Sequence, residues 1–288
     1  MNRNLYLLTV FIIILNTSVF GIGTQFLSIP NTARELALGV NPALKGESFS
    51  NPAVSNSHVQ NPDIFISHGS WIAGVTSTTI QFSKGTGGIQ IRYSGISDLE
   101  FRTGIPTDNA LAEFGAYGTS FGGFYSKQLG NNYFELSLKG IGFQIYDESS
   151  YGYAADLGFT KIFGKKFNVG LSVLNIGSMS VLSKTVPNLP VRILSGIRYQ
   201  SSYKSWKNEV FLSLEKSSLN SGLIYRIGNE FTWQKIAIQA GTQLSEKVNS
   251  ISGGIRLRLG MYSFQYGVQI GSQDLGLSQM LDFSVRLP

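Results

Sequence analysis

Apolar residues or glycines occupy every second position in three consecutive runs near the end of the chain, residues 251–259, 262–270 and 281–287. Polar residues, arginines or glycines fill the positions between them. A period of two is that of a β-strand with one apolar and one polar face. Runs of roughly ten residues exceed the usual length of strands in soluble sheets and match strands that cross a bilayer. The pattern therefore predicts a transmembrane β-barrel.

Composition is consistent with a wall that faces lipid. The chain has 288 residues with 33 glycines, and only 14% of its residues are charged, well below the usual quarter. The mean hydropathy of +0.06 is too low for a helical membrane protein, as expected where half of each strand faces water. The net charge of +6 does not indicate nucleic-acid binding, because the basic residues alternate along strands rather than forming one patch.

The first 21 residues have the organisation of a secretory signal peptide. Arg3 precedes an apolar run over residues 5–15, and residues 19–21 offer a small-residue cleavage site. The alternative is a short membrane anchor, but the polar residues 16–18 end the apolar run too early for a span. We therefore expect residues 1–21 to be a signal peptide.

Residues 22–62 differ from the strands that follow: they contain four prolines, and apolar and polar residues show little alternation. A short helix is expected near residues 32–38, with Asn31 or Thr32 as its N-cap. A segment of this kind before a barrel is either a periplasmic tail or a plug inside the lumen. The plug is favoured, because a free tail is not expected to hold several large apolar residues, namely Phe26, Leu27, Ile29, Leu36 and Leu38.

Residues 63–288 are predicted to form an all-β, 14-stranded antiparallel barrel, and an even number is typical of single-chain bacterial barrels. The candidate strands are 63–68, 73–83, 87–96, 112–128, 132–146, 151–163, 167–177, 189–201, 206–216, 219–228, 231–243, 248–259, 261–271 and 277–287. Within 132–146 the apolar positions change phase, which predicts a β-bulge near Gly140.

The joins between these strands alternate in length. Longer joins include residues 97–111 and 178–188, whereas the intervening ones, such as 84–86 and 229–230, are tight. Outer-membrane barrels have long extracellular loops and short periplasmic turns. The alternation therefore predicts a Gram-negative outer-membrane location with both termini in the periplasm.

Charged residues on the strands are expected to point into the lumen, since an Arg or Lys facing lipid at mid-depth costs about 2–4 kcal/mol. Their expected role is structural, in ion pairs with the plug and across the lumen; a role in selectivity is the alternative. The predicted lumen-facing residues are Arg92, Asp156, Arg192, Arg198, Arg256 and Arg258, together with Glu135, Lys139, Glu209, Arg226, Lys235, Asp282 and Arg286.

No pattern indicates a catalytic, metal or cofactor site. The chain has no cysteine, which excludes disulfides and thiolate ligands, and only two histidines, His58 and His68. The glycine cluster 85–88 joins two predicted strands and precedes no helix, so it is read as a hairpin turn rather than a phosphate loop. We expect a non-enzymatic protein without a cofactor.

Several short motifs resemble those of the PorV/PorQ family. They are residues 26–29 with Thr32-Ala33-Arg34 and Gly39, then Asn51-Pro52-Ala53, and later residues 154–158 and 175–177. The resemblance implies a 14-stranded barrel related to FadL-type fatty-acid transporters, with Arg34, Asn51 and Pro52 in its plug. It also implies a part in type IX secretion, as a PorV-like cargo shuttle or a PorQ-like component of a surface-attachment complex. The compact segment 40–50 favours the PorQ-like form.

Three functional hypotheses follow. The first is a plugged outer-membrane barrel that binds secretion or attachment proteins and secreted cargo through its outward loops, with outer-membrane lipid around it and no nucleic-acid partner. The second is a transporter of hydrophobic small molecules that uses residues 22–62 as a movable hatch. The third is a structural barrel or a lipid-acting enzyme.

Overall fold

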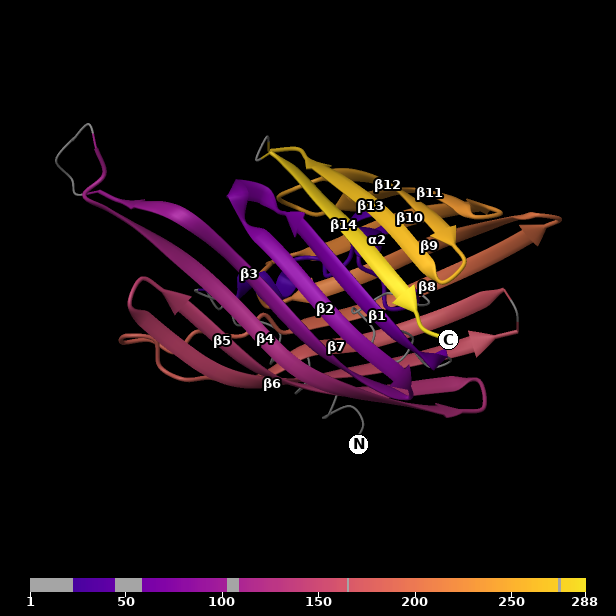
Figure 1. Ribbon diagram of the computed structural model, residues 1–288, viewed down its shortest axis with the longest axis horizontal. Coiled ribbons are helices and arrows are strands. Elements are labelled where there is room, and N and C mark those ends of the chain that lie inside the picture. Colours follow the sequence, from indigo (N-terminus) through magenta and orange to yellow (C-terminus); the bar gives the residue numbers. More distant parts are fainter. Residues whose placement is uncertain (1–22, 45–58, 103–108, 165, 274–275) are drawn as a thin grey trace, which may run out of the picture.

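Fourteen antiparallel strands form a closed ring, in which each strand pairs with its neighbours in the chain and β1 pairs with β14. The computed structural model describes residues 23–44, 59–102, 109–164, 166–273 and 276–288 (Figure 1). The predicted 14-stranded antiparallel barrel is confirmed. The strands are β1 (Val59–Ser70), β2 (Thr76–Gly85), β3 (Gly87–Phe101), β4 (Ala112–Leu129), β5 (Asn132–Ile145), β6 (Glu148–Phe163), β7 (Phe167–Met179), β8 (Arg192–Tyr203), β9 (Trp206–Ser217), β10 (Leu223–Trp233), β11 (Ile236–Leu244), β12 (Ser250–Leu259), β13 (Tyr262–Gly271) and β14 (Leu277–Arg286).

The joins gather at two ends of the barrel. At one end they are one to three residues long, and the C-terminus lies at this short-turn end (Figure 1). At the other end the joins reach ten residues at 102–111 and twelve at 180–191. The join 146–147 is the exception, since it has only two residues at this long-join end.

Strand β1 begins at Val59, four residues before the domain boundary expected from the sequence. Pro62 therefore lies within β1. It is tolerated there because pairing with β14 ends at Asp63, and the pairing with β2 is interrupted between Val59 and Asp63, so no ladder hydrogen bond is lost at a proline nitrogen.

The outer wall carries the apolar face that the alternation predicted. In β5, for example, Phe134, Leu136 and Leu138 are all exposed. Aromatic side chains gather outside near the short turns, where Tyr203, Trp206 and Phe231 form successive ring contacts. Such girdles are typical of the interfaces between a bilayer and water.

The bulge expected near Gly140 is absent. The ladder of β5 is unbroken with both β4 and β6 along its whole length. The apolar residues change phase because the inward face itself turns apolar: Ile141 and Phe143 are buried in the lumen and belong to a cluster with Phe26 and Leu27.

The turn expected at residues 229–230 is also wrong. Strands β10 and β11 pair without interruption up to Trp233 and Ile236, so the turn lies at residues 234–235. Gly228 is not in a turn. It allows α2 to lie close to β10, because a Cβ at this position would be 2.4 Å from the carbonyl oxygen of Leu38. The side-chain amide of Asn229 donates to two acceptors on β9, the side-chain oxygen of Asn208 and the backbone carbonyl of Glu209.

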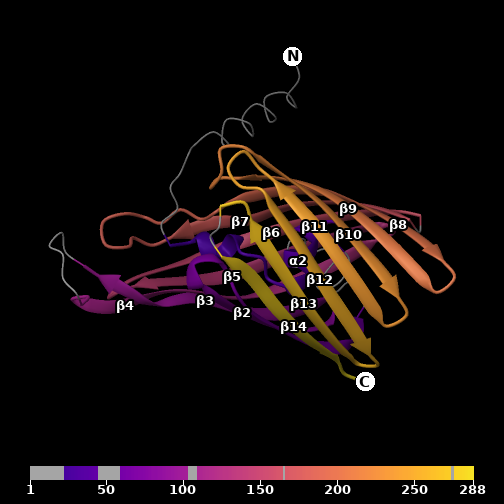
Figure 2. The same cartoon turned by 90° about the horizontal axis from the view of Figure 1, so that it is seen from above.

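Residues 23–44, here called the inner segment, lie inside the ring (Figures 1 and 2). The segment contains a 3-10 turn, η1 (Gln25–Ser28), and one helix, α2 (Ala33–Leu38). A second short turn, η2 (Ile72–Gly74), lies in the join between β1 and β2. In the described part of the chain no helix has the length and apolar character needed to span a membrane.

Candidate functional site

Helix α2 is held against the wall at its first turn. Thr32 is the N-cap, and its hydroxyl accepts a hydrogen bond from the Glu35 backbone N–H at 3.0 Å. The carboxylate of Glu35 in turn accepts from the N–H of Asn31 at 3.0 Å. Asp282 of β14 accepts from the Ala33 N–H with both oxygens, at 2.9 and 2.8 Å. These contacts satisfy N–H groups that a helix start leaves without an intrahelical partner.

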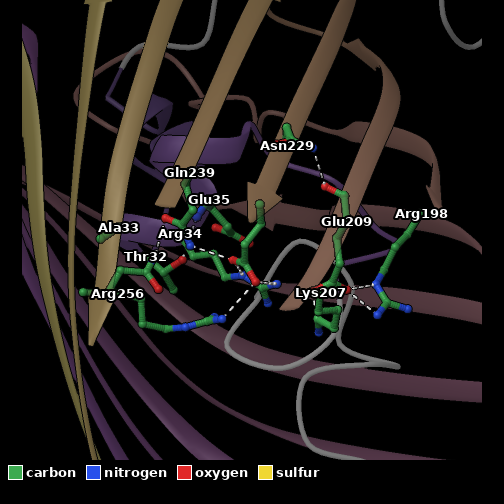
Figure 3. A network of polar contacts seen from close by, with 12 residues as sticks. Thr32, Ala33, Arg34, Glu35, Arg198, Lys207, Glu209, Asn229, Gln239 and Arg256 are labelled. Atoms are coloured by element: carbon green, nitrogen blue, oxygen red, sulfur yellow. Dashed lines mark hydrogen bonds and ion pairs between the residues drawn. The ribbon is translucent and has the colours of Figure 1, made fainter. Parts of the chain in front are cut away.

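A buried ion-pair network joins the next residue of the helix to the wall. Arg34 contacts Glu230 of β10 at 3.1 Å, and Arg256 of β12 contacts the same carboxylate at 2.9 Å (Figure 3). Gln239 of β11 donates to Glu230 at 2.7 Å. Glu230 is fully buried, so the two arginines compensate a charge that would otherwise be costly to bury.

Polar side chains of the wall also donate hydrogen bonds to backbone carbonyls of the inner segment. Arg92 donates to the carbonyl of Ile29 at 3.0 Å, and Ser252 to that of Ala37 at 2.8 Å. Further along, Ser213 donates to the carbonyl of Val40 at 2.9 Å. The inner segment is therefore hydrogen-bonded to strands on several sides of the ring.

The start of the inner segment is held by apolar packing. Phe26, Leu27 and Ile29 form a buried cluster with side chains of the opposite wall. That wall is lined by Ile141, Phe143, Ala154, Met179, Leu182 and Leu189.

One cavity of about 250 Å³ lies between the inner segment and strands β8 to β14, toward the long-join end. Its charged wall holds Glu215, which pairs with Arg192 at 2.6 Å and with Arg226 at 2.8 Å. Glu35 of α2 lines the same space. The apolar side chains of the lining are Pro30, Val40, Trp71, Ile72, Leu219, Ile224 and Val248.

A second cavity, of about 400 Å³, lies on the other side of the inner segment against β3, β4 and β5. Trp71 and Ile72 line both cavities. The second cavity also reaches Gly95 and Ile96, where β2 ends its pairing with β3 while β3 continues along β4 to Phe101. Its lining is mostly apolar and includes Phe26, Ile29, Val75 and Phe143.

Most of the predicted lumen-facing residues are buried and paired. Arg92 and Arg256 contact the inner segment or its ion-pair partner, whereas Arg192 and Arg198 pair with Glu215 and Glu209 of β9. Asp156 accepts from Lys139 at 2.7 Å and from the N–H of Asn175 at 2.6 Å. The 154–158 and 175–177 motifs are thus brought together at the irregular pairing between β6 and β7.

Other predicted residues lie at the rim. Arg258 is on the same face as Arg256 but is exposed, because β12 ends at Leu259. Lys235 is in the turn between β10 and β11, and Arg286 lies 3.7 Å from Asp63 with 59% of its side chain exposed. Of the predicted plug residues, Arg34 is in the network above, whereas Asn51 and Pro52 lie outside the described residues.

Sequence reasoning missed the two residues shared by the cavities, Trp71 and Ile72. They lie in a join between strands, where alternation carries no signal, and a tryptophan outside the periodic pattern was the only available indication. In the described residues no group of three or more His, Cys, Asp or Glu side chains is placed to hold a metal ion. His68 is exposed on β1 and its Nδ1 lies 2.8 Å from the Thr78 hydroxyl.

No protein-family model matches the chain, and no curated protein matches it in sequence. Solved structures do share the barrel. CymD, a monoaromatic hydrocarbon channel, matches over 94% of this chain and 94% of its own, with a TM-score of 0.60 and 10% identity. The Pseudomonas putida toluene transporter TodX matches over 88% of this chain and 96% of its own, with a TM-score of 0.60 and 8% identity.

At such low identity the likeness establishes the fold, which is that of 14-stranded outer-membrane barrels. It does not extend to the PorV/PorQ family in particular. The comparison therefore leaves function to be argued from the lumen itself.

Proposed function

We propose that this barrel lies in the outer membrane and passes small apolar or amphipathic molecules across it. The observation that carries the proposal is the pair of cavities beside the inner segment, which share Trp71 and Ile72 in their linings. One reaches the joins at the long-join end, and the other reaches the place where β2 and β3 part. The hydrocarbon channels named above have the same barrel.

The sizes of the cavities favour a small ligand. Apolar cavities of about 150 Å³ bind benzene, whereas drug-sized ligands fill roughly 300–1,000 Å³. Cavities of about 250 and 400 Å³ suit a molecule of one or two rings, or a short alkyl chain. Because Arg192 and Arg226 are already paired with Glu215, the polar wall of the first cavity suits a hydroxyl or carbonyl group better than a free charge.

The inner segment serves as the barrier in this proposal. It is bound to the wall through hydrogen bonds and the Arg34–Glu230 pair, so a solute can pass only if some of these contacts are released. Deleting residues 24–50 should raise the leakage of small solutes through the barrel in proteoliposomes. Arg34→Ala, which removes one ion pair and leaves the chain complete, should raise it less; unchanged leakage in both variants would contradict the barrier role.

Tryptophan fluorescence offers a direct binding test. The chain has three tryptophans, Trp71, Trp206 and Trp233, so a variant with Trp206→Phe and Trp233→Phe leaves only the cavity residue. Titration of this variant in detergent with toluene, and separately with a medium-chain fatty acid, should give a saturable change in emission.

The matched control keeps Trp206 alone, through Trp71→Phe and Trp233→Phe, and should show no saturable change, because Trp206 lies at the short-turn end. Ile72→Asp in the first variant should weaken binding at least tenfold, since it places a charge in both cavities. Equal responses from the cavity and rim tryptophans would indicate nonspecific partitioning and would overturn the proposal.

A part in type IX secretion stays a prediction that rests on short motifs. The motif around Arg34 docks the inner segment, and those at 154–158 and 175–177 meet through Asp156 and Asn175, so a structural role already accounts for them. Pull-down of the tagged barrel from solubilised outer membranes separates the two hypotheses. Co-purification of large secretion proteins would favour secretion, whereas recovery of the barrel alone, with loss of hydrocarbon uptake on deletion, would favour transport.

A further inference from the structure

Exposed charges are distributed unequally between the two ends of the barrel. At the long-join end, acids outnumber bases among the described exposed residues, where the bases are Arg102, Lys184 and Lys247. Arg102 is moreover paired with an acid, Glu100, at 2.6 Å. The exposed acids at this end are Asp98, Glu100, Glu113, Asp147, Glu148 and Glu246.

The short-turn end is basic. Within the described residues of this end every acidic side chain is buried, namely Asp63, Glu135, Glu209 and Glu230. Lysines are exposed here at five of the six short turns. This lysine belt consists of Lys84, Lys127, Lys161, Lys166, Lys204 and Lys235.

The belt lies directly beside the aromatic girdle. Lys127 and Lys161 point outward, since their neighbours Ser126 and Thr160 are buried in the lumen. The ammonium of Lys161 lies 5.0 Å from the ring centroid of Phe163, and that of Lys204 lies 5.3 Å from Tyr203. Aromatic rings at the interface mark the level of the headgroups, and lysines near strand ends extend toward the same level.

We propose that the lysine belt binds the phosphate groups of anionic phospholipids in the leaflet at the short-turn end. The belt runs around the ring from β2 to the turn between β10 and β11, so surrounding lipids can reach all of its lysines at once, whereas one docked protein would cover only one side. Lysine on a flexible stem is a good ligand for a phosphate of variable position. The same headgroups would repel the acidic long-join end. The difference in charge therefore favours the orientation that places the short-turn end in the leaflet with the anionic phospholipids.

The test compares two triple variants that each remove three positive charges. One carries Lys127→Gln, Lys161→Gln and Lys204→Gln from the belt; the other carries Lys184→Gln, Lys216→Gln and Lys247→Gln from the long-join end. Each purified barrel is offered an equimolar mixture of phosphatidylglycerol and phosphatidylcholine in detergent, and bound lipid is counted by native mass spectrometry. The unmodified chain and the long-join variant should prefer phosphatidylglycerol by about fivefold or more. In the belt variant, which keeps three of the six lysines, the preference should fall to about twofold.

Three outcomes would overturn the proposal. The first is an unmodified chain without preference for phosphatidylglycerol. The second is an equal loss in both triple variants, which would mean that only net charge matters. The third is binding of an acidic periplasmic protein that depends on the belt while lipid preference does not. Excess inorganic phosphate should leave the preference in place, because free phosphate lacks acyl chains to lie against the girdle.

Discussion

The two halves of the inner segment differ in the contacts that dominate their packing against the wall. Residues 24–29 pack through Phe26, Leu27 and Ile29 onto an apolar wall of β5, β6 and β7. Helix α2 meets the polar wall of β10 to β14, where Glu230 and Asp282 accept its arginine and its first N–H. Apolar burial is non-directional, whereas a bidentate or ion-paired contact has a specific geometry. The comparison indicates that α2 sets the register of the segment and that the first half fills space.

Glu230→Ala should have the largest effect, because it leaves Arg34 and Arg256 buried without their shared carboxylate. Breaking a buried pair in this way costs about 3–5 kcal/mol. The free energy of unfolding, from urea titration in phosphatidylcholine vesicles, measures it. Glu246→Ala, an exposed acid at the long-join end, is the matched control and should change stability by less than about 0.5 kcal/mol. Similar losses in the two variants would mean that the buried ion-pair network contributes no more to stability than an exposed acid does.

Ile141→Ala tests the apolar half. Ile141 is 3% exposed in the lumen cluster, and its truncation should cost about 2–4 kcal/mol by leaving a cavity. Leu138→Ala on the same strand is the control: Leu138 is 59% exposed on the outer wall, where acyl chains can fill the space. An equal loss at both positions, in the same vesicle assay, would mean that the inner segment adds little to the packing.

Gly228→Ala tests the close approach of α2 to the polar wall. The added methyl would lie 2.4 Å from the Leu38 carbonyl oxygen, so the helix must shift, at a cost of about 1–3 kcal/mol. Gly253→Ala is matched to it, because the nearest atom to its new methyl is 3.6 Å away. Stability and the leakage assay should both respond to the first variant only.

Arg286→Gln should have the smallest effect. Its contact with Asp63 is 3.7 Å long and Arg286 is largely exposed, and exposed pairs contribute about 0–1 kcal/mol. A loss comparable to that of Glu230→Ala would show that the rim pairs matter as much as those in the lumen.

The strand number can be predicted from the sequence because the outward face of the strands is largely apolar, which gives a recurring alternation. The inward face was harder to predict. The change of phase at Gly140 predicts a bulge only if the lumen is polar there, whereas Ile141 and Phe143 face the lumen and pack against Phe26 and Leu27. Alternation reports the polarity of a neighbour and does not say whether that neighbour is lipid or protein.

The ion-pair network cannot be predicted from the sequence, for a related reason. The motif singles out Arg34, but the sequence places Glu230 in a turn, since Gly228 and Asn229 are common turn residues. Glycine serves tight turns and close contacts alike, and only the position of Leu38 distinguishes the two at Gly228. Partners across strands depend on the register of the pairing and on the helix inside the ring, neither of which the alternation encodes.

Asp282 has a consequence for how the molecule is assembled. Asp282 lies on β14, the last strand, which closes the ring by pairing with β1. Its side chain accepts a hydrogen bond from the first N–H of α2. Closure of the barrel and docking of the helix therefore meet at one residue: its backbone pairs opposite Ser67 of β1, and its carboxylate binds α2. Because the partner of the first N–H of α2 lies on the last strand of the chain, this contact can form only after β14 has taken its place in the ring.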